Sequence, residues 1–168
     1  MNPLPTDQRS ADRRQDLPAT RQDHGVPEAA ARLYSRGARR GWTLTPATGG
    51  IALVTGDSVS GVRIPEPLAT DVRGFLDANN LTGPIIRTSG PIPCDIHLVT
   101  GTRKAESAVA ALRAAQVTVL TGGEIIALPY PGSAHGHVWV DIPDPAGGLP
   151  SILAIAAAVR AVRTARPS

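Results

Sequence analysis

Short aliphatic runs, each followed closely by glycine or proline, recur along this chain and narrow the folds open to it. Runs at 51–55, 94–100, 117–120 and 124–128 have the length of strands and are too short for typical helices. Helix-like segments separate groups of two or three such runs, whereas a doubly wound parallel sheet would alternate strand and helix more strictly. The pattern therefore predicts an α+β fold, with helices packed on a mixed β-sheet. The 168 residues fit a single domain and are enough to bury a core.

Turn residues and helix-type spacing place the remaining elements. Gly122 and Gly123 predict a hairpin that joins the runs at 117–120 and 124–128. Proline at 46 is expected to end a short strand that begins at Trp42. The other expected elements are helices at 26–41, 68–78, 103–115 and 151–164, and strands at 62–64, 84–88 and 137–142.

The chain divides by composition into three parts. Residues 1–24 are rich in Asp, Arg, Gln and Pro, and we expect a disordered tail because so little apolar surface cannot offset the entropy of ordering. Residues 25–148 carry the elements of the predicted domain. Residues 149–168 form an alanine-rich helix that either packs on this domain or is appended to it.

The amino-acid composition limits the kinds of ligand and site that this chain can be expected to have. Aromatic residues make up only 3%, which disfavours a dedicated single-strand nucleic-acid binder, because such proteins stack bases on aromatic rings. Both ends of the predicted domain carry surplus arginine while the middle is net negative, a pattern typical of solvated helix ends. The single cysteine excludes an internal disulfide and a cysteine-based zinc site. No cofactor and no metal ligand set is predicted.

Targeting signals are not evident in the sequence. The stretch 1–23 is polar and has no apolar core, so it does not resemble a secretory signal. The longest aliphatic stretch, 152–159, is far below the roughly 20 residues that span a bilayer. We therefore expect no membrane partner and a cytoplasmic location.

Three large enzyme classes are disfavoured by missing motifs. The chain has no P-loop, no Gly-x-Ser-x-Gly elbow and no His-Glu-x-x-His helix.

Cys94 is a weak candidate nucleophile, because in a strand it points away from His97 and a buried free cysteine usually packs as a small hydrophobe.

The run around His97 is the most informative segment. Alternation places Ile96 and Leu98 on one face, expected to be core, and Asp95 and His97 together on the other. Asp95 would there orient the imidazole and raise its pKa. The competing interpretation, favoured when the pair is taken alone, is a solvent-facing Asp–His pair on the sheet surface.

Two further histidines lie at the start of the last predicted strand and just before it. His135 and His137 offer two metal ligands, but no third or fourth ligand lies nearby in the sequence. Further along this strand, Val138, Val140 and Ile142 are expected to face the core.

The order of these segments resembles the N-terminal domain of bifunctional DNA primase/polymerases, in a divergent, actinobacterial-type form. The helix at 30–34 and Gly-Trp-Thr-Leu-Thr-Pro within 40–47 are similar to the opening of that family. The segment 55–62 is similar to the approach to its acidic metal motif, and 87–98 to its "Ser-Gly … His" strand, whose histidine contacts nucleotide phosphates. The stretch 122–129 resembles its late Gly-Gly signature. The likeness implies a primase–polymerase-like fold over about 29–140.

The acidic residues of this family are missing here. Phosphoryl transfer in such a site relies on two divalent cations held by carboxylates. Arg63 and Pro65 stand where the resemblance calls for two of them, and no carboxylate lies within 118–121, where another is expected. An arginine repels a cation, so no catalytic residue is predicted. Metal-dependent polymerisation is therefore not expected.

The resemblance nevertheless implies a phosphate-facing groove. Arg63, Arg87, Ser89 and His97 would face a nucleotide or phosphate, with Asp95 in support. The sequence thus predicts a degenerate, non-catalytic primase–polymerase-like domain that binds a nucleotide or nucleic acid.

Two alternatives remain open at this point. The first is an active nucleotidyltransferase that binds Mg²⁺ or Mn²⁺ through Asp57, Glu66 or Asp95 as substitute carboxylates. The second is a protein-interaction module that uses the C-terminal helix.

Overall fold

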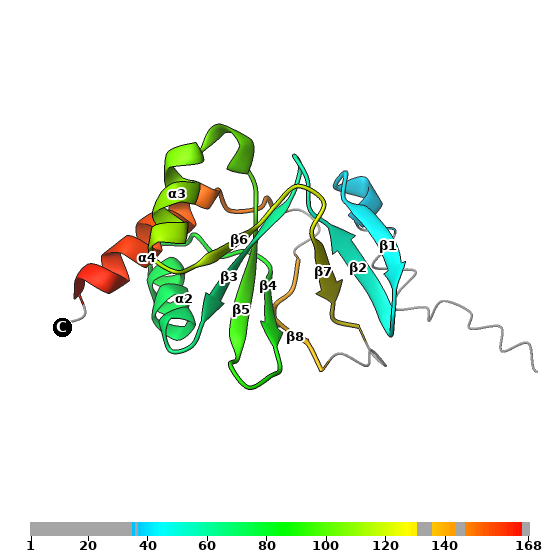
Figure 1. Cartoon of the computed structure of the whole chain (residues 1–168), viewed down its shortest axis with the longest axis horizontal. Coiled ribbons are helices and arrows are strands. Elements are labelled where there is room, and N and C mark those ends of the chain that lie inside the picture. The colour runs from blue at the N-terminus through cyan, green and yellow to red at the C-terminus, as the bar shows by residue number, and fades with distance from the viewer. Residues whose placement is uncertain (1–34, 36, 131–135, 144–146, 166–168) are drawn as a thin grey trace, which may run out of the picture.

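Two hydrophobic cores lie on opposite sides of a central sheet. The computed structural model describes residues 35, 37–130, 136–143 and 147–165. Three helices cover one face of a five-stranded sheet, and a three-stranded sheet covers the other (Figure 1). The α+β class predicted from the sequence is confirmed, but the strands of both sheets pair antiparallel and not in the mixed arrangement that was expected. The predicted tail at 1–24 and most of the helix at 26–41 lie outside the described residues.

The central sheet has the strand order β6-β3-β5-β4-β8, and every pairing within it is antiparallel. Strand β5 lies in the middle of this sheet, with the helices over one face and the small sheet over the other. Its residues are therefore buried or nearly so. The bounds are β3 Ser60–Pro65, β4 Ile85–Thr88, β5 Cys94–Val99, β6 Thr118–Leu120 and β8 Val138–Asp141.

The small sheet has the order β1-β2-β7 and is also antiparallel, with β1 Thr43–Ala47, β2 Gly50–Val54 and β7 Ile125–Leu128. Strand β1 continues through Pro46 instead of ending there as predicted. This is possible because β1 is an edge strand, where a residue without an N–H can be tolerated. Leu53 and Ile126 pack from this sheet against Ile96 and Leu98 of β5.

The helices that pack on the central sheet are α2 Leu68–Ala78, α3 Glu106–Ala114 and α4 Ile152–Ala165, with a short 3₁₀ turn η1 at Thr102–Lys104 before α3. Helix α4 buries Ile152, Ile155 and Val159 against the central sheet and its neighbouring helices. Burying each of these aliphatic side chains contributes about 1.5–3 kcal/mol. The C-terminal helix is therefore part of the core and is not merely appended to it.

The predicted hairpin between 117–120 and 124–128 is wrong. Gly122 and Gly123 do form a turn, with φ of 67° and 95°, which the lack of a Cβ permits. However, β6 pairs with β3 in the central sheet, whereas β7 pairs with β2 in the small sheet. The turn therefore carries the chain from one layer to the other.

The predicted orientation of the last strand is also wrong. Val138, Val140 and Ile142 are 53%, 39% and 63% exposed, whereas Trp139 packs on the core between the sheets. Trp139 donates its indole N–H to the carbonyl oxygen of Pro129 at 2.9 Å. Strand β8 is the outer strand of its sheet, so only the face that carries the tryptophan is covered.

Candidate functional site

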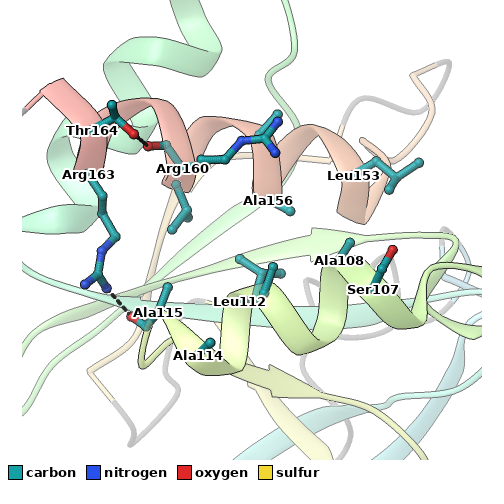
Figure 2. Close-up of a pocket in the computed structure, with 13 residues that line it drawn as sticks. Ser107, Ala108, Leu112, Ala114, Ala115, Leu153, Ala156, Arg160, Arg163 and Thr164 are labelled. Atoms are coloured by element: carbon teal, nitrogen blue, oxygen red, sulfur yellow. Dashed lines mark hydrogen bonds between the residues drawn. The ribbon is translucent and has the colours of Figure 1, made fainter.

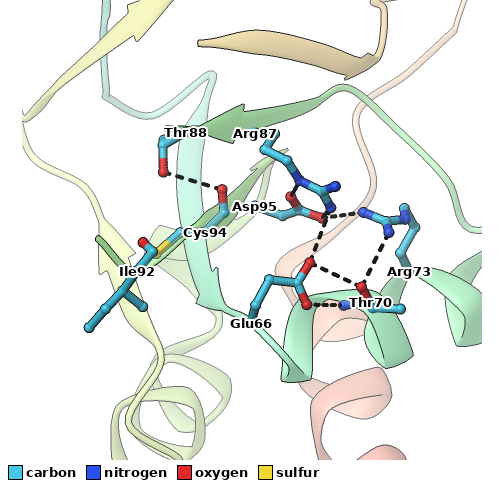
Figure 3. A network of polar contacts seen from close by, with 8 residues as sticks. All are labelled: Glu66, Thr70, Arg73, Arg87, Thr88, Ile92, Cys94 and Asp95. Atoms are coloured by element: carbon cyan, nitrogen blue, oxygen red, sulfur yellow. Dashed lines mark hydrogen bonds and ion pairs between the residues drawn. The ribbon is translucent and has the colours of Figure 1, made fainter. Parts of the chain in front are cut away.

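A buried carboxylate on β5 organises the main polar cluster among the described residues. Asp95 is completely buried and accepts hydrogen bonds from two arginines (Figure 3). Arg87 donates from Nε to Oδ1 at 2.9 Å and from Nη2 to Oδ2 at 3.1 Å, and Arg73 donates from Nη1 to Oδ2. Both carboxylate oxygens are thereby satisfied, which is the condition for keeping a charge buried.

Strand register and helix position bring these groups together. Arg87 on β4 lies directly opposite Asp95 on β5, so their side chains leave the sheet on the same face. Arg73 reaches the carboxylate from α2, which packs over that face. The hydrogen bonds that Arg87 donates to Asp95 are the main reason that the pKa of Arg87 is raised above its ordinary value.

Glu66 completes the cluster at its exposed side. Its Oε1 accepts a hydrogen bond from Arg87 Nη2 at 3.2 Å and another from the hydroxyl of Thr70 at 3.0 Å. Its Oε2 accepts one from the backbone N–H of Thr70 at 3.2 Å. A carboxylate that accepts an N–H from the first turn of α2 also interacts favourably with the helix dipole. Two arginines and two carboxylates thus balance in charge.

His97 lies on the same face of β5 as Asp95 but is only 1% exposed, and its Nε2 has no hydrogen-bond partner. Desolvation by burial lowers the pKa of His97 to about 4, an effect that Arg73 reinforces and Asp95 opposes. The imidazole is therefore neutral at pH 7. The interpretation of a solvent-facing Asp–His pair is wrong, because helices cover this face of the sheet.

Asp95 does raise the pKa of His97, as expected, but the net shift of that pKa is downward. Burial outweighs the attraction of the carboxylate. The oxygens of Asp95 receive guanidinium donors from Arg73 and Arg87, which present charged N–H groups in a matching fork.

The residues predicted for a phosphate groove do not all converge. Arg63 lies opposite Ile96 in the register, which puts it on the other face of the sheet from Arg87 and His97, and it is exposed there. Ser89 follows the end of β4 and is exposed, close to Gly136. The fold therefore brings Arg87 and Asp95 into contact, places His97 beside them in the interior, and separates Arg63 from all three.

The candidate metal ligands are likewise dispersed. His137 is half-buried with Nδ1 3.4 Å from the carbonyl oxygen of Ala127, and His135 lies outside the described residues. Asp57 pairs with Arg103 at 3.1 Å on the surface, whereas Glu66 and Asp95 pair with Arg87. Over the described part of the chain, no group of three or more His, Cys, Asp or Glu residues is placed to hold a metal ion.

A groove between α3 and α4 is the feature that sequence reasoning missed. It encloses about 620 Å³, and α3 and α4 run side by side along it with their C-terminal ends at the same end (Figure 2). Many of its lining residues are alanines, and Leu153 is 58% exposed at one end. The lining residues are Ser107, Ala108, Ala111, Leu112, Ala114, Ala115, Leu153, Ala156, Ala157, Val159, Arg160, Arg163 and Thr164.

Two arginines mark the C-terminal end of this groove. Arg163 donates from Nη1 to the carbonyl oxygen of Ala115 at 2.7 Å, which ties the last turn of α4 to the end of α3. Arg160 lies one turn earlier and is exposed. None of the described residues that line the groove is acidic. The abundance of alanine in α4 was the available signal, because small residues let another helix approach closely.

Among the described residues, no helix is both long enough and apolar enough to cross a lipid bilayer. Comparisons with protein-family models, with curated proteins and with solved structures found no match for this chain.

Proposed function

We propose that this chain is a non-catalytic, primase–polymerase-like domain of the cytoplasm that acts by binding a helix of another protein. The groove between α3 and α4 carries this proposal. Its volume of about 620 Å³ and its lining of alanine, leucine and valine suit the apolar stripe of an amphipathic helix. Ala111 and Ala157 are exposed on its two walls, so a partner backbone can approach without displacing large side chains.

The likeness to primase–polymerases supports the non-catalytic part of the proposal. Arg63 and Pro65 occupy the positions at which that likeness calls for carboxylates. Arg63 is exposed, and no buried acid among the described residues of the sheet compensates its positive charge. A domain that lost its metal ligands is free to retain its fold for contacts with a partner.

Synthetic peptides test the groove directly. The three peptides are amphipathic, have about 18 residues and the same Ala/Leu stripe, and carry Glu, Gln or Lys in the first turn. We expect at least one of them to shift the amide NMR signals of α3 and α4. Ala111→Glu places a charge in the groove and should weaken that binding at least about tenfold, because a buried unpaired charge is costly.

Ala110→Glu is the matched control, because Ala110 is the neighbouring exposed alanine of α3 and does not line the groove. Its binding should equal that of the wild type. Absence of binding by all three peptides, or equal binding by both variants, would overturn the proposal.

A second proposal retains nucleotide or phosphate binding at the polar cluster. Arg87 favours it, because this side chain remains 35% exposed although Asp95 holds it. Calorimetric titration of a nucleoside triphosphate separates the two proposals. Binding without metal that is lost in Arg87→Met supports the phosphate groove. Mn²⁺-dependent binding revives the active enzyme, and no binding in either condition leaves the protein-binding proposal.

A further inference from the structure

The α3/α4 groove has two chemically different ends. Leu153 lies at the N-terminal end of α4 and is 58% exposed, so this end offers aliphatic surface. Arg163 lies at the other end, beside the last residues of α3, and the Arg160 side chain runs back along α4 toward Ala156 (Figure 2). The groove therefore distinguishes the two ends of any helix that enters it.

The basic end is built to receive carboxylates. Arg163 uses one Nη1 donor on the carbonyl oxygen of Ala115, which orients its guanidinium across the groove. A guanidinium has five N–H donors, so the remaining ones can hold a carboxylate in a fork. Arg160 adds a second positive charge, and none of the described lining residues supplies an acid to neutralise either arginine.

Helix dipoles favour the same arrangement. Because α3 and α4 point their C-terminal ends the same way, the partial negative charges of both helix ends meet at the arginine end. The N-terminus of an incoming helix carries partial positive charge and favours Asp or Glu in its first turn. The partial positive charge of the partner's N-terminus therefore complements the two helix ends, while carboxylates in its first turn complement the arginines.

We propose that the partner is an amphipathic helix with an acidic N-terminal turn, which lies antiparallel to α3 and α4 and places its carboxylates on Arg160 and Arg163. Its small apolar stripe packs on the alanines, and its C-terminal half contacts Leu153. This inference rests on the proposed function, since it names the partner of the same groove.

Three peptides with the same Ala/Leu stripe and either Glu, Gln or Lys in the first turn test the charge. We expect the Glu peptide to bind about fivefold more tightly than the Gln peptide and the Lys peptide to bind most weakly. Raising the salt concentration should narrow these differences, because the arginines are exposed and screened.

Charge reversal at the groove supplies the second readout. Arg160→Glu should reverse the preference, so that the Lys peptide becomes the tighter ligand. Lys104→Glu is the matched control, because it makes the same change in net charge on an exposed residue outside the groove. It should leave the order of the peptides unchanged.

A spin label on the peptide N-terminus tests the direction. It should broaden the amide signals near Arg163 and leave those near Leu153 sharp. The reverse pattern would overturn the antiparallel arrangement.

The outcomes separate this inference from the function on which it rests. Equal binding of the Glu and Gln peptides in the groove would overturn the acidic partner and leave helix binding intact. No binding of any peptide would overturn both. A dimer of the chain itself that Ala111→Glu dissociates would assign the groove to a second copy and also overturn the inference.

Discussion

Asp95 and His97 lie two residues apart on one face of β5, and both are almost completely buried. The carboxylate is matched by Arg73 and Arg87, whereas Nε2 of the imidazole has no hydrogen-bond partner. The charged side chain is thus stabilised by its partners, while the histidine remains neutral. The difference indicates that burial of a polar group in this layer requires either full pairing or loss of charge.

The largest expected effect comes from removing the carboxylate. Asp95→Ala leaves Arg73 and Arg87 without their buried acceptor, and we expect the free energy of unfolding to fall by about 3 kcal/mol. Urea denaturation followed by circular dichroism measures this loss.

If Asp95→Ala does not fold, a variant of the cluster without charges still tests the role of the ion pairs. The triple variant Asp95→Leu, Arg73→Met, Arg87→Met should recover most of the stability, because no buried charge is left unpaired. A triple variant as unstable as the single one would contradict the role assigned to the ion pairs.

The next effect concerns the pH dependence of stability. The pKa of His97 is about 4 in the folded protein and about 6.5 when unfolded, so the unfolded chain binds the proton more readily. The stability that the folded protein gains by keeping His97 neutral is complete above about pH 6.5 and is lost as the pH falls toward 4. We expect this to cost about 2 kcal/mol of the free energy of unfolding by pH 4.5.

The histidine variant isolates that contribution from the carboxylates, which also titrate in acid. His97→Leu should remain folded at pH 7, because it removes a polar atom that has no partner. Its stability should decline less between pH 7 and pH 4.5 than that of the wild type. Urea titrations at the two pH values measure this decline for both proteins. If the free energy of unfolding falls equally in the variant and in the wild type, His97 does not titrate as its burial requires.

The smallest expected effect is at the exposed side of the cluster. Glu66→Gln weakens the contact with Arg87 and the interaction with the first turn of α2, but the Glu66 side chain is 26% exposed. We expect a loss below about 1 kcal/mol, measured by the same urea denaturation. A loss as large as that of Asp95→Ala would mean that Glu66, and not Asp95, holds the cluster together.

Alternation along β5 was predictable in detail. The sequence correctly placed Ile96 and Leu98 on one buried face and Asp95 and His97 on the other. It did not indicate that the second face lies beneath helices, since no local pattern reports which segment covers a sheet. Arg73 was missed for the same reason, because it reaches Asp95 from an element 22 residues earlier in the chain.

Strand partners were the least predictable feature. Glycines 122 and 123 mark a turn, as expected, but turn residues do not state whether the strands on either side pair with each other. The pairing of β6 with β3 and of β7 with β2 depends on packing between the two sheets. Val138, Val140 and Ile142 were wrongly expected to face the core, because exposure on an edge strand depends on what lies beside it.

The sequence by itself determined the local elements of this protein: the aliphatic strands, the turns between them, the amphipathic helices and the face on which each β5 side chain lies. These features follow from short-range sterics and from alternation of polar and apolar residues. Only the tertiary structure decided that Asp95 is paired by Arg73 and Arg87, that His97 is buried and neutral, and that α3 and α4 form a groove. Those outcomes depend on contacts between distant segments, because burial and charge pairing are set by neighbours in space and not by neighbours in sequence.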